Sequence, residues 1–154
     1  MTAFPMPMPG PGYWEHTRPS DWADVLATFP LFSGIGKRRL RKLVRSATVA
    51  EYGRLDVVIQ KGTSGESLYV ILSGSAQAVG KPASRPLRTG DYFGELSLLD
   101  GTPRSATVVA TSELHVMELP REAFIGLTED EPGISLKMLK TLGTQIRRLE
   151  AQPA

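Results

Sequence analysis

The sequence contains no cysteine and no asparagine, and only two of its 154 residues are histidine. Without cysteine the chain has no disulfide, no thiol nucleophile and no zinc-thiolate site. Without asparagine it has no N-glycosylation sequon. His16 and His115 are isolated in the sequence, whereas metal-binding barrels need more ligands close together. We therefore expect no resident metal and no cofactor, and we interpret His115 as a surface or strand-packing residue.

Long apolar runs are also missing. The longest, Leu68 to Leu72, is far shorter than the roughly 20 residues that a helix needs to span a bilayer. The N-terminus lacks the basic region and the apolar region of a signal peptide. We therefore expect no membrane segment and a location in the cytoplasm.

The sequence shows no recognisable set of catalytic residues. There is no Gly-x-Ser-x-Gly elbow, and Gly36-Lys37 and Gly80-Lys81 lack the glycine that a P-loop places five residues earlier. No nucleophile, base and orienting residue stand out together. We therefore predict that the chain is not an enzyme.

The composition suits one globular domain with a disordered tail. Hydrophobic residues make up 41% of the chain and charged residues 22%, which is enough apolar surface for a real core. The net charge is only +2. Residues 1–19 differ from the rest, because prolines at positions 5, 7, 9 and 11 alternate with methionine and glycine. We predict a disordered proline-rich tail over 1–19 and a folded domain over 20–152.

Apolar residues recur at helical spacing near both ends of the chain and at strand spacing between them. The sequence predicts short helices over residues 22–28 and 37–47, strands over 57–60, 67–72, 76–79, 105–110 and 114–119, and helices over 121–127 and 132–150. Short strands separated by glycines are typical of a sandwich or barrel. Helices at both ends then indicate an α+β domain.

Two short motifs carry the functional signal. Phe93-Gly94-Glu95-Leu96 is followed by a short apolar segment and then by Pro103-Arg104-Ser105-Ala106. Upstream, glycines at 62, 65 and 74 surround the apolar strand that begins at Leu68. This pattern resembles the phosphate-binding cassette of the cyclic nucleotide-binding domain family, and the resemblance covers residues 24–150. It implies a double-stranded β-helix or jelly-roll barrel flanked by N-terminal helices and a C-terminal helix.

The chemistry of these residues fits a cyclic nucleotide. Arg104 can offer a planar pair of donors to the cyclic phosphate. Glu95 can accept a hydrogen bond from the ribose 2′-hydroxyl. A helical turn over 96–99 would point its first amides at the anion. The resemblance assigns ligand contacts to Gly94, Glu95, Leu96, Ser97, Arg104, Ser105 and Ala106. The simpler alternative is that Glu95 and Arg104 form an ordinary ion pair around an apolar turn.

The chain departs from the family pattern at two places. The family usually has glycine near position 55, where this chain has Leu55. In the family the last helix closes over the base, and here the chain ends soon after Leu149. Ile146, Arg148 and Leu149 are therefore the candidates for covering the base. We expect cAMP rather than cGMP as the ligand, although Ser105 by itself does not decide between them.

We predict a stand-alone regulatory sensor with no DNA-reading domain in the same chain. Its output would pass through the last helix to a separate partner or to a second copy, through the stripe formed by Met138, Leu142, Ile146 and Leu149. The alternative is a structural or interaction domain with the same roll that binds no nucleotide. Six basic residues over 37–45 could contact nucleic acid or anionic lipid, or simply form the solvated side of a helix.

Overall fold

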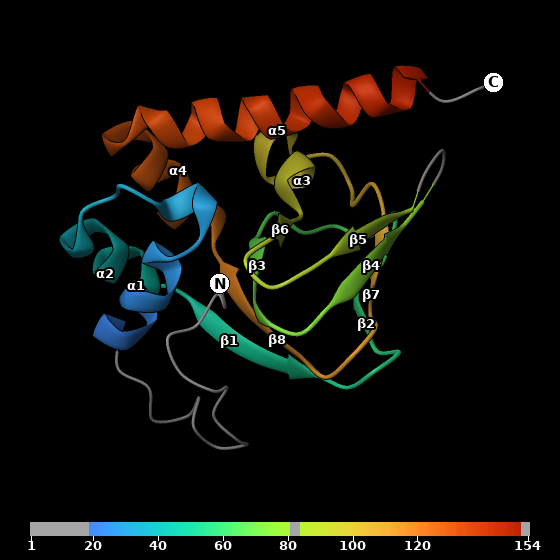
Figure 1. The fold of residues 1–154 in the computed structure, drawn as a ribbon, viewed down its shortest axis with the longest axis horizontal. Coiled ribbons are helices and arrows are strands. Elements are labelled where there is room, and N and C mark those ends of the chain that lie inside the picture. The colour runs from blue at the N-terminus through green and yellow to red at the C-terminus, as the bar shows by residue number, and fades with distance from the viewer. Residues whose placement is uncertain (1–18, 81–83, 152–154) are drawn as a thin grey trace.

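The computed structural model describes residues 19–80 and 84–151 (Figure 1). The elements follow in the order α1 (Pro19–Ala27), η2 (Pro30–Phe32), α2 (Lys37–Arg45), β1 (Thr48–Tyr52), β2 (Val57–Ile59), β3 (Leu68–Ser73), β4 (Ala76–Val79), β5 (Arg85–Leu87), β6 (Tyr92–Phe93), α3 (Glu95–Asp100), β7 (Thr107–Ala110), β8 (Leu114–Leu119), α4 (Arg121–Asp130) and α5 (Pro132–Ala151). The predicted tail lies outside the described residues, except for Pro19, which begins α1.

Eight strands form two antiparallel sheets of four strands each. The first sheet has the order β1-β8-β3-β6, and the second has the order β2-β7-β4-β5. Neighbouring strands in both sheets pair antiparallel. The sheets face each other as a double-sheet roll, with helices before and after it in the chain (Figure 1). The predicted α+β jelly-roll architecture is therefore confirmed.

Strand β3 lies at the centre of the fold because it is buried on both faces. Leu68, Val70 and Leu72 pack into the core that the helices form against the first sheet. The alternate residues Tyr69 and Ile71 point into the second core, between the two sheets. A strand with both faces covered carries no polar face. This burial explains why the longest apolar run of the sequence is a strand.

The sequence patterns located five of the eight strands and missed β1, β5 and β6. Strand β5 contains Pro86, which cannot donate a ladder hydrogen bond. The strand order places β5 at the edge of its sheet, where such a residue is tolerated. Strand β6 has only two residues, too few to show a pattern. Strand β6 ends at Phe93, the first residue of the Phe93–Leu96 motif, and β5 comes shortly before it in the chain.

The helices form a layer on one side of the roll, and α5 runs along its outside above α3 (Figure 1). α5 is anchored near its start by the buried side chains of Ile134 and Met138. Lys137 adds a polar anchor, because its ammonium group donates to the backbone oxygens of Pro30 and Ser33 at 3.1 and 2.8 Å. None of the described helices is long and apolar enough to cross a membrane.

Leu55 occupies a turn that suits glycine. Its φ is 76°, in the left-handed region, and its side chain is 70% exposed. The turn is fixed by hydrogen bonds from the Leu55 amide to the Ala110 oxygen and from the Gly53 amide to the Asp56 carboxylate, both 2.7 Å long. A left-handed conformation costs a residue with a Cβ about 1–2 kcal/mol. The leucine is therefore strained without gaining burial in return.

Replacing Leu55 with glycine is expected to stabilise the protein. Removing the strained left-handed conformation gains more free energy than the extra entropy of glycine in the unfolded chain costs. We therefore expect an increase of about 0.5–1 kcal/mol in the free energy of unfolding. Urea unfolding measures this gain. Leu55→Ala is the matched control, because it keeps the Cβ and hence the strain. A Leu55→Gly protein no more stable than Leu55→Ala would contradict the strain.

Candidate functional site

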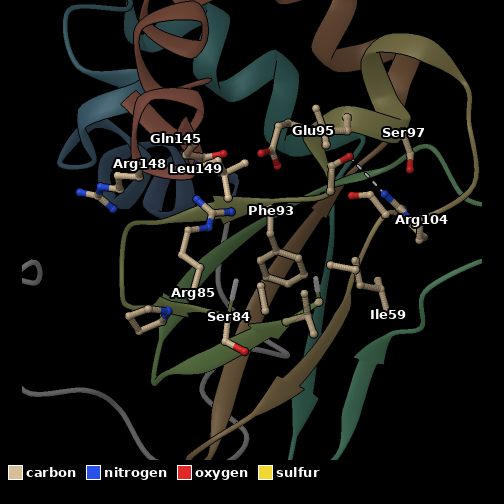
Figure 2. Close-up of a pocket in the computed structure, with 18 residues that line it drawn as sticks. Ile59, Ser84, Arg85, Phe93, Glu95, Ser97, Arg104, Gln145, Arg148 and Leu149 are labelled. Atoms are coloured by element: carbon tan, nitrogen blue, oxygen red, sulfur yellow. Dashed lines mark hydrogen bonds between the residues drawn. The ribbon is translucent and has the colours of Figure 1, made fainter. Parts of the chain in front are cut away.

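A cavity of about 390 Å³ opens between the roll, α3 and the last turns of α5 (Figure 2). This volume lies within the usual range of small-molecule sites, about 300–1,000 Å³. Its walls come from segments that are far apart in the sequence. The lining residues are Ile59, Ala78, Gly80, Ser84, Arg85, Pro86, Phe93, Gly94, Glu95, Leu96, Ser97, Arg104, Ser105, Ala106, Val108, Gln145, Arg148 and Leu149.

The structure brings nearly all of the sequence-predicted site residues to this cavity. All seven residues predicted to contact the ligand line it: Gly94, Glu95, Leu96, Ser97, Arg104, Ser105 and Ala106. Of the three residues predicted to cover the base, Arg148 and Leu149 line the cavity. Ile146 does not line it and is 55% exposed, because it lies on the outer face of α5.

Arg104 is held rigidly inside the fold. Its side chain donates to the backbone oxygens of Gly94 and Ser67, both at 3.1 Å. Its own backbone pairs with the 62–63 segment, through the Gly62 amide and the Thr63 oxygen, both at 2.8 Å. The guanidinium also lies 5.6 Å from the centre of the Tyr69 ring. The residue is only 4% exposed, so a positive charge is fixed at the cavity wall.

Two glycines make room for this guanidinium. A Cβ on Gly94 would lie 2.8 Å from Nη1 of Arg104, and a Cβ on Gly65 would lie 3.0 Å from Nη2. Gly94 also has a φ of 86°, which glycine adopts without strain. The glycine pattern of the motif is therefore explained by the close packing of Arg104 as well as by any approach of a ligand.

Glu95 is buried in the same cavity without touching Arg104. It begins α3 directly after Gly94, and it is 6% exposed. Burial raises the pKa of its carboxyl, while its backbone amide, Arg85 and Arg104 act in the opposite direction. No ion pair joins Glu95 to Arg104 within the described part of the chain, so the simple ion-pair alternative is wrong. The cavity thus holds a fixed cation and a separate carboxyl group.

Arg85 is the main cavity residue that the sequence analysis missed. It comes from edge strand β5 and lies on the opposite side of Phe93 from Arg104 (Figure 2). Its positive charge lowers the pKa of the Glu95 carboxyl more than the charge of Arg104 does, although burial raises that pKa overall. Gln145 of α5 also lines the cavity and was missed. Neither residue belongs to a motif, and only the fold brings them to the site.

A second polar row crosses the first sheet away from this cavity. Ser73 Oγ lies 3.0 Å from Nδ1 of His115, and Nε2 of His115 lies 3.0 Å from the Glu51 carboxylate. This row of hydroxyl, imidazole and carboxylate was not predicted from the sequence. Ser73 and His115 are each 8% exposed, and none of the three lines the 390 Å³ cavity. His115 packs between strands, as expected, and joins β3, β8 and β1.

Comparisons with known proteins converge on one family. Residues 49–131, more than half of the chain, match the family model described as the cyclic nucleotide-binding domain. A cAMP-dependent protein kinase regulatory subunit of Aspergillus fumigatus is 35% identical over 68% of this chain and 27% of its own length. A cyclic nucleotide-gated potassium channel of Rhizobium etli is 30% identical over 84% of this chain and 38% of its own. The chain thus spans about a quarter to two fifths of these relatives.

Solved structures show the same fold. The regulatory domain of Toxoplasma gondii PKA, crystallised with cAMP, superposes with a TM-score of 0.73 at 24% identity. The match covers 82% of this chain and 50% of that one.

Replacing Glu95 with glutamine is expected to stabilise the ligand-free protein at neutral pH. A raised pKa means that the folded state binds the proton more tightly than the unfolded chain. The free energy of unfolding therefore falls as the pH rises through the raised pKa, and a neutral glutamine does not show this loss. Melting temperatures of Glu95→Gln and the parent should coincide in acid and separate towards neutral pH. The exposed Glu113→Gln is the control, and a constant difference at all pH values would contradict the burial effect.

Proposed function

The chain belongs to the cyclic nucleotide-binding domain family, and on that premise we propose that its 390 Å³ cavity binds cAMP in preference to cGMP. The cyclic phosphate lies against Arg104 and the first turn of α3, and the ribose lies against Glu95. The base extends towards β5 and α5. Gly94, Leu96, Ser97, Ser105 and Ala106 complete the wall around the phosphate and the sugar.

The observation that carries this proposal is the buried guanidinium of Arg104. Its described hydrogen bonds go to two neutral carbonyl oxygens, and no carboxylate of the described residues forms an ion pair with it. Taking a charge out of water is costly unless an opposite charge compensates it. An anionic ligand supplies that charge, and the two carbonyls hold the fork in place before the ligand arrives.

Glu95 supplies the second half of the recognition. Within a cyclic nucleotide, the ribose 2′-hydroxyl is the free donor next to the phosphate. A carboxylate that is already desolvated forms a strong hydrogen bond to such a hydroxyl. Burial raises the pKa of the Glu95 carboxyl, and the charges of Arg85 and Arg104 oppose part of that rise, which favours the ionised form that accepts a hydrogen bond.

The preference for cAMP is supported by the residues at the base end of the cavity. Gln145 projects from α5 as a half-buried amide, and an amide can pair with both N6 and N7 of adenine. Arg148 and Leu149 of the same helix line the cavity next to Gln145. Arg85 is the residue that would favour guanine, because a guanidinium pairs with O6 and N7 of that base.

The output of the domain passes through α5. The predicted stripe of Met138, Leu142, Ile146 and Leu149 is not a single exposed surface. Met138 is buried in the core and Leu142 is half-buried. The exposed apolar residues of α5 are instead Leu136, Leu139, Ile146 and Leu149, of which the first three lie outside the cavity and form an outer face. We propose that a protein partner or a second copy covers this outer face, and Leu139→Gln should then reduce self-association or partner capture in sedimentation experiments without lowering nucleotide affinity.

The family is generally a regulatory, non-catalytic module. We propose that this chain likewise binds the nucleotide without hydrolysing it. The alternative function, a structural domain that binds no nucleotide, keeps the same roll and predicts no response to either ligand. Calorimetric titration separates the two directly.

Substitution of Arg104 is expected to weaken cAMP binding strongly. Arg104→Lys keeps the charge but loses the bidentate fork, and a charge-assisted hydrogen bond is worth about 1.5–3 kcal/mol. We therefore expect about tenfold to hundredfold weaker binding in isothermal titration, with cGMP binding more weakly than cAMP to the parent protein.

Two controls keep this titration interpretable. Arg88→Gln removes an exposed arginine outside the cavity and should leave the affinity unchanged. The melting temperature of each variant reports loss of the Ser67 and Gly94 hydrogen bonds separately from loss of ligand. Tight cAMP binding by a folded Arg104→Lys protein would refute the assigned role, and no heat from the parent with either nucleotide would favour the structural alternative.

A further inference from the structure

The positive charge of the chain is concentrated on one short helix. α2 has nine residues, six of them lysine or arginine and none of them acidic. The other 145 residues contain 12 basic and 16 acidic residues and therefore carry a net charge of −4. Figure 1 places α2 beside α1 at the edge of the helical layer, away from β4 and β5. The overall charge of +2 thus hides a strongly asymmetric surface.

Burial of the other side of α2 fixes the direction of this charge. Leu40, Leu43 and Val44 are 0%, 2% and 6% exposed and belong to the helical core. The helix therefore cannot rotate its charges inward. It also has no free apolar side to insert into a bilayer, as an interfacial helix would.

Carboxylates of the same chain neutralise only part of this charge. Lys37 pairs with Asp24 at 3.0 Å, and Arg39 pairs with Glu131 at the start of α5. Lys42 shares a small cavity of about 160 Å³ with two acidic side chains of α4. Arg38, Arg41 and Arg45 form no ion pair within residues 19–80 and 84–151, and we refer to these three residues as the arginine row.

Arg41 shows that the arginine row is not fully solvated. Its Nε atom is buried and has no hydrogen-bond partner among the described residues. A buried donor without a partner costs free energy, and the same burial removes water from the Arg41 charge. An anion next to this guanidinium would offset part of the cost of the lost hydration. The charge at the centre of the row therefore favours a negatively charged partner group.

The spacing of the arginine row matches the spacing of side chains along one face of an α-helix. Its members follow one another after three and four residues, so they lie on one side of α2 and span about 10.5 Å along the axis. A guanidinium binds a carboxylate through two parallel hydrogen bonds. Glutamates at the same spacing on a second helix would face the three arginines in register.

We propose that the arginine row is the docking surface for an acidic helical segment of a partner protein. A long polyanion, such as DNA or an anionic membrane, would extend past α2 and also meet Glu122 and Asp130 of α4, which form no ion pair within the described residues. These carboxylates would repel it. An acidic helix as short as the row needs to contact only the three arginines. This proposal does not depend on nucleotide binding.

Fluorescence anisotropy of a labelled peptide tests the proposal. The probe is an alanine-rich helix with glutamates at three- and four-residue spacing, and its control has glutamines instead. Arg38→Gln, Arg41→Gln and Arg45→Gln together should weaken binding at least about tenfold, and added salt should weaken it in the parent. Arg54→Gln, Lys61→Gln and Arg147→Gln together remove the same charge elsewhere and should leave binding within about twofold.

The competing outcomes are distinct. The proposal is overturned if no peptide binds at low salt, or if the control triple variant weakens binding equally, because the effect would then be one of net charge. It is also overturned if a short DNA duplex or phosphatidylserine vesicles bind the row more tightly than the peptide. Melting temperatures and a second variant with Arg41 retained, Arg38→Gln with Arg45→Gln, separate lost docking from lost folding.

Discussion

The hydrogen bonds from Arg104 to the oxygens of Ser67 and Gly94 are the interactions on which the site depends. They join the segment before β3 to the segment before α3, which lie next to each other, since a Cβ on Gly94 would lie 3.0 Å from the Ser67 oxygen. The backbone of Arg104 ties the Gly62–Thr63 turn to the same point. A single buried side chain therefore holds this end of the cavity in shape, and its charge forms no ion pair with a carboxylate of the described residues.

The charged side chains form two separate surfaces, one inside the cavity and one on α2. Inside the cavity, Arg85 and Arg104 lie on either side of Phe93 and both act on Glu95, so that a small anionic ligand meets fixed donors and one acceptor (Figure 2). Outside, α2 carries cations that the rest of the chain only partly neutralises. The ion pair of Arg39 with Glu131 connects this second surface to the start of α5, the helix that closes the cavity.

Sequence patterns predicted the fold and singled out two short segments whose residues line one cavity, because both depend on local signals. The apolar run of β3 reflects burial on two faces, and the residues around Gly94 and Arg104 form recognisable motifs. Residues positioned by tertiary packing gave no such signal. Arg85 comes from an edge strand whose proline obscures the strand pattern. Gln145 reaches the cavity from α5 without belonging to a motif, and the strain of Leu55 appears only in its backbone angle.

The most direct test of the account is a crystal structure of the protein grown with cAMP. The account predicts a phosphate oxygen within hydrogen-bond distance of the Arg104 guanidinium and a 2′-hydroxyl on the Glu95 carboxylate, with both arginine bonds to the Ser67 and Gly94 oxygens still present. A nucleotide bound elsewhere, or a cavity left empty at saturating cAMP, would contradict the central role given to the buried arginine.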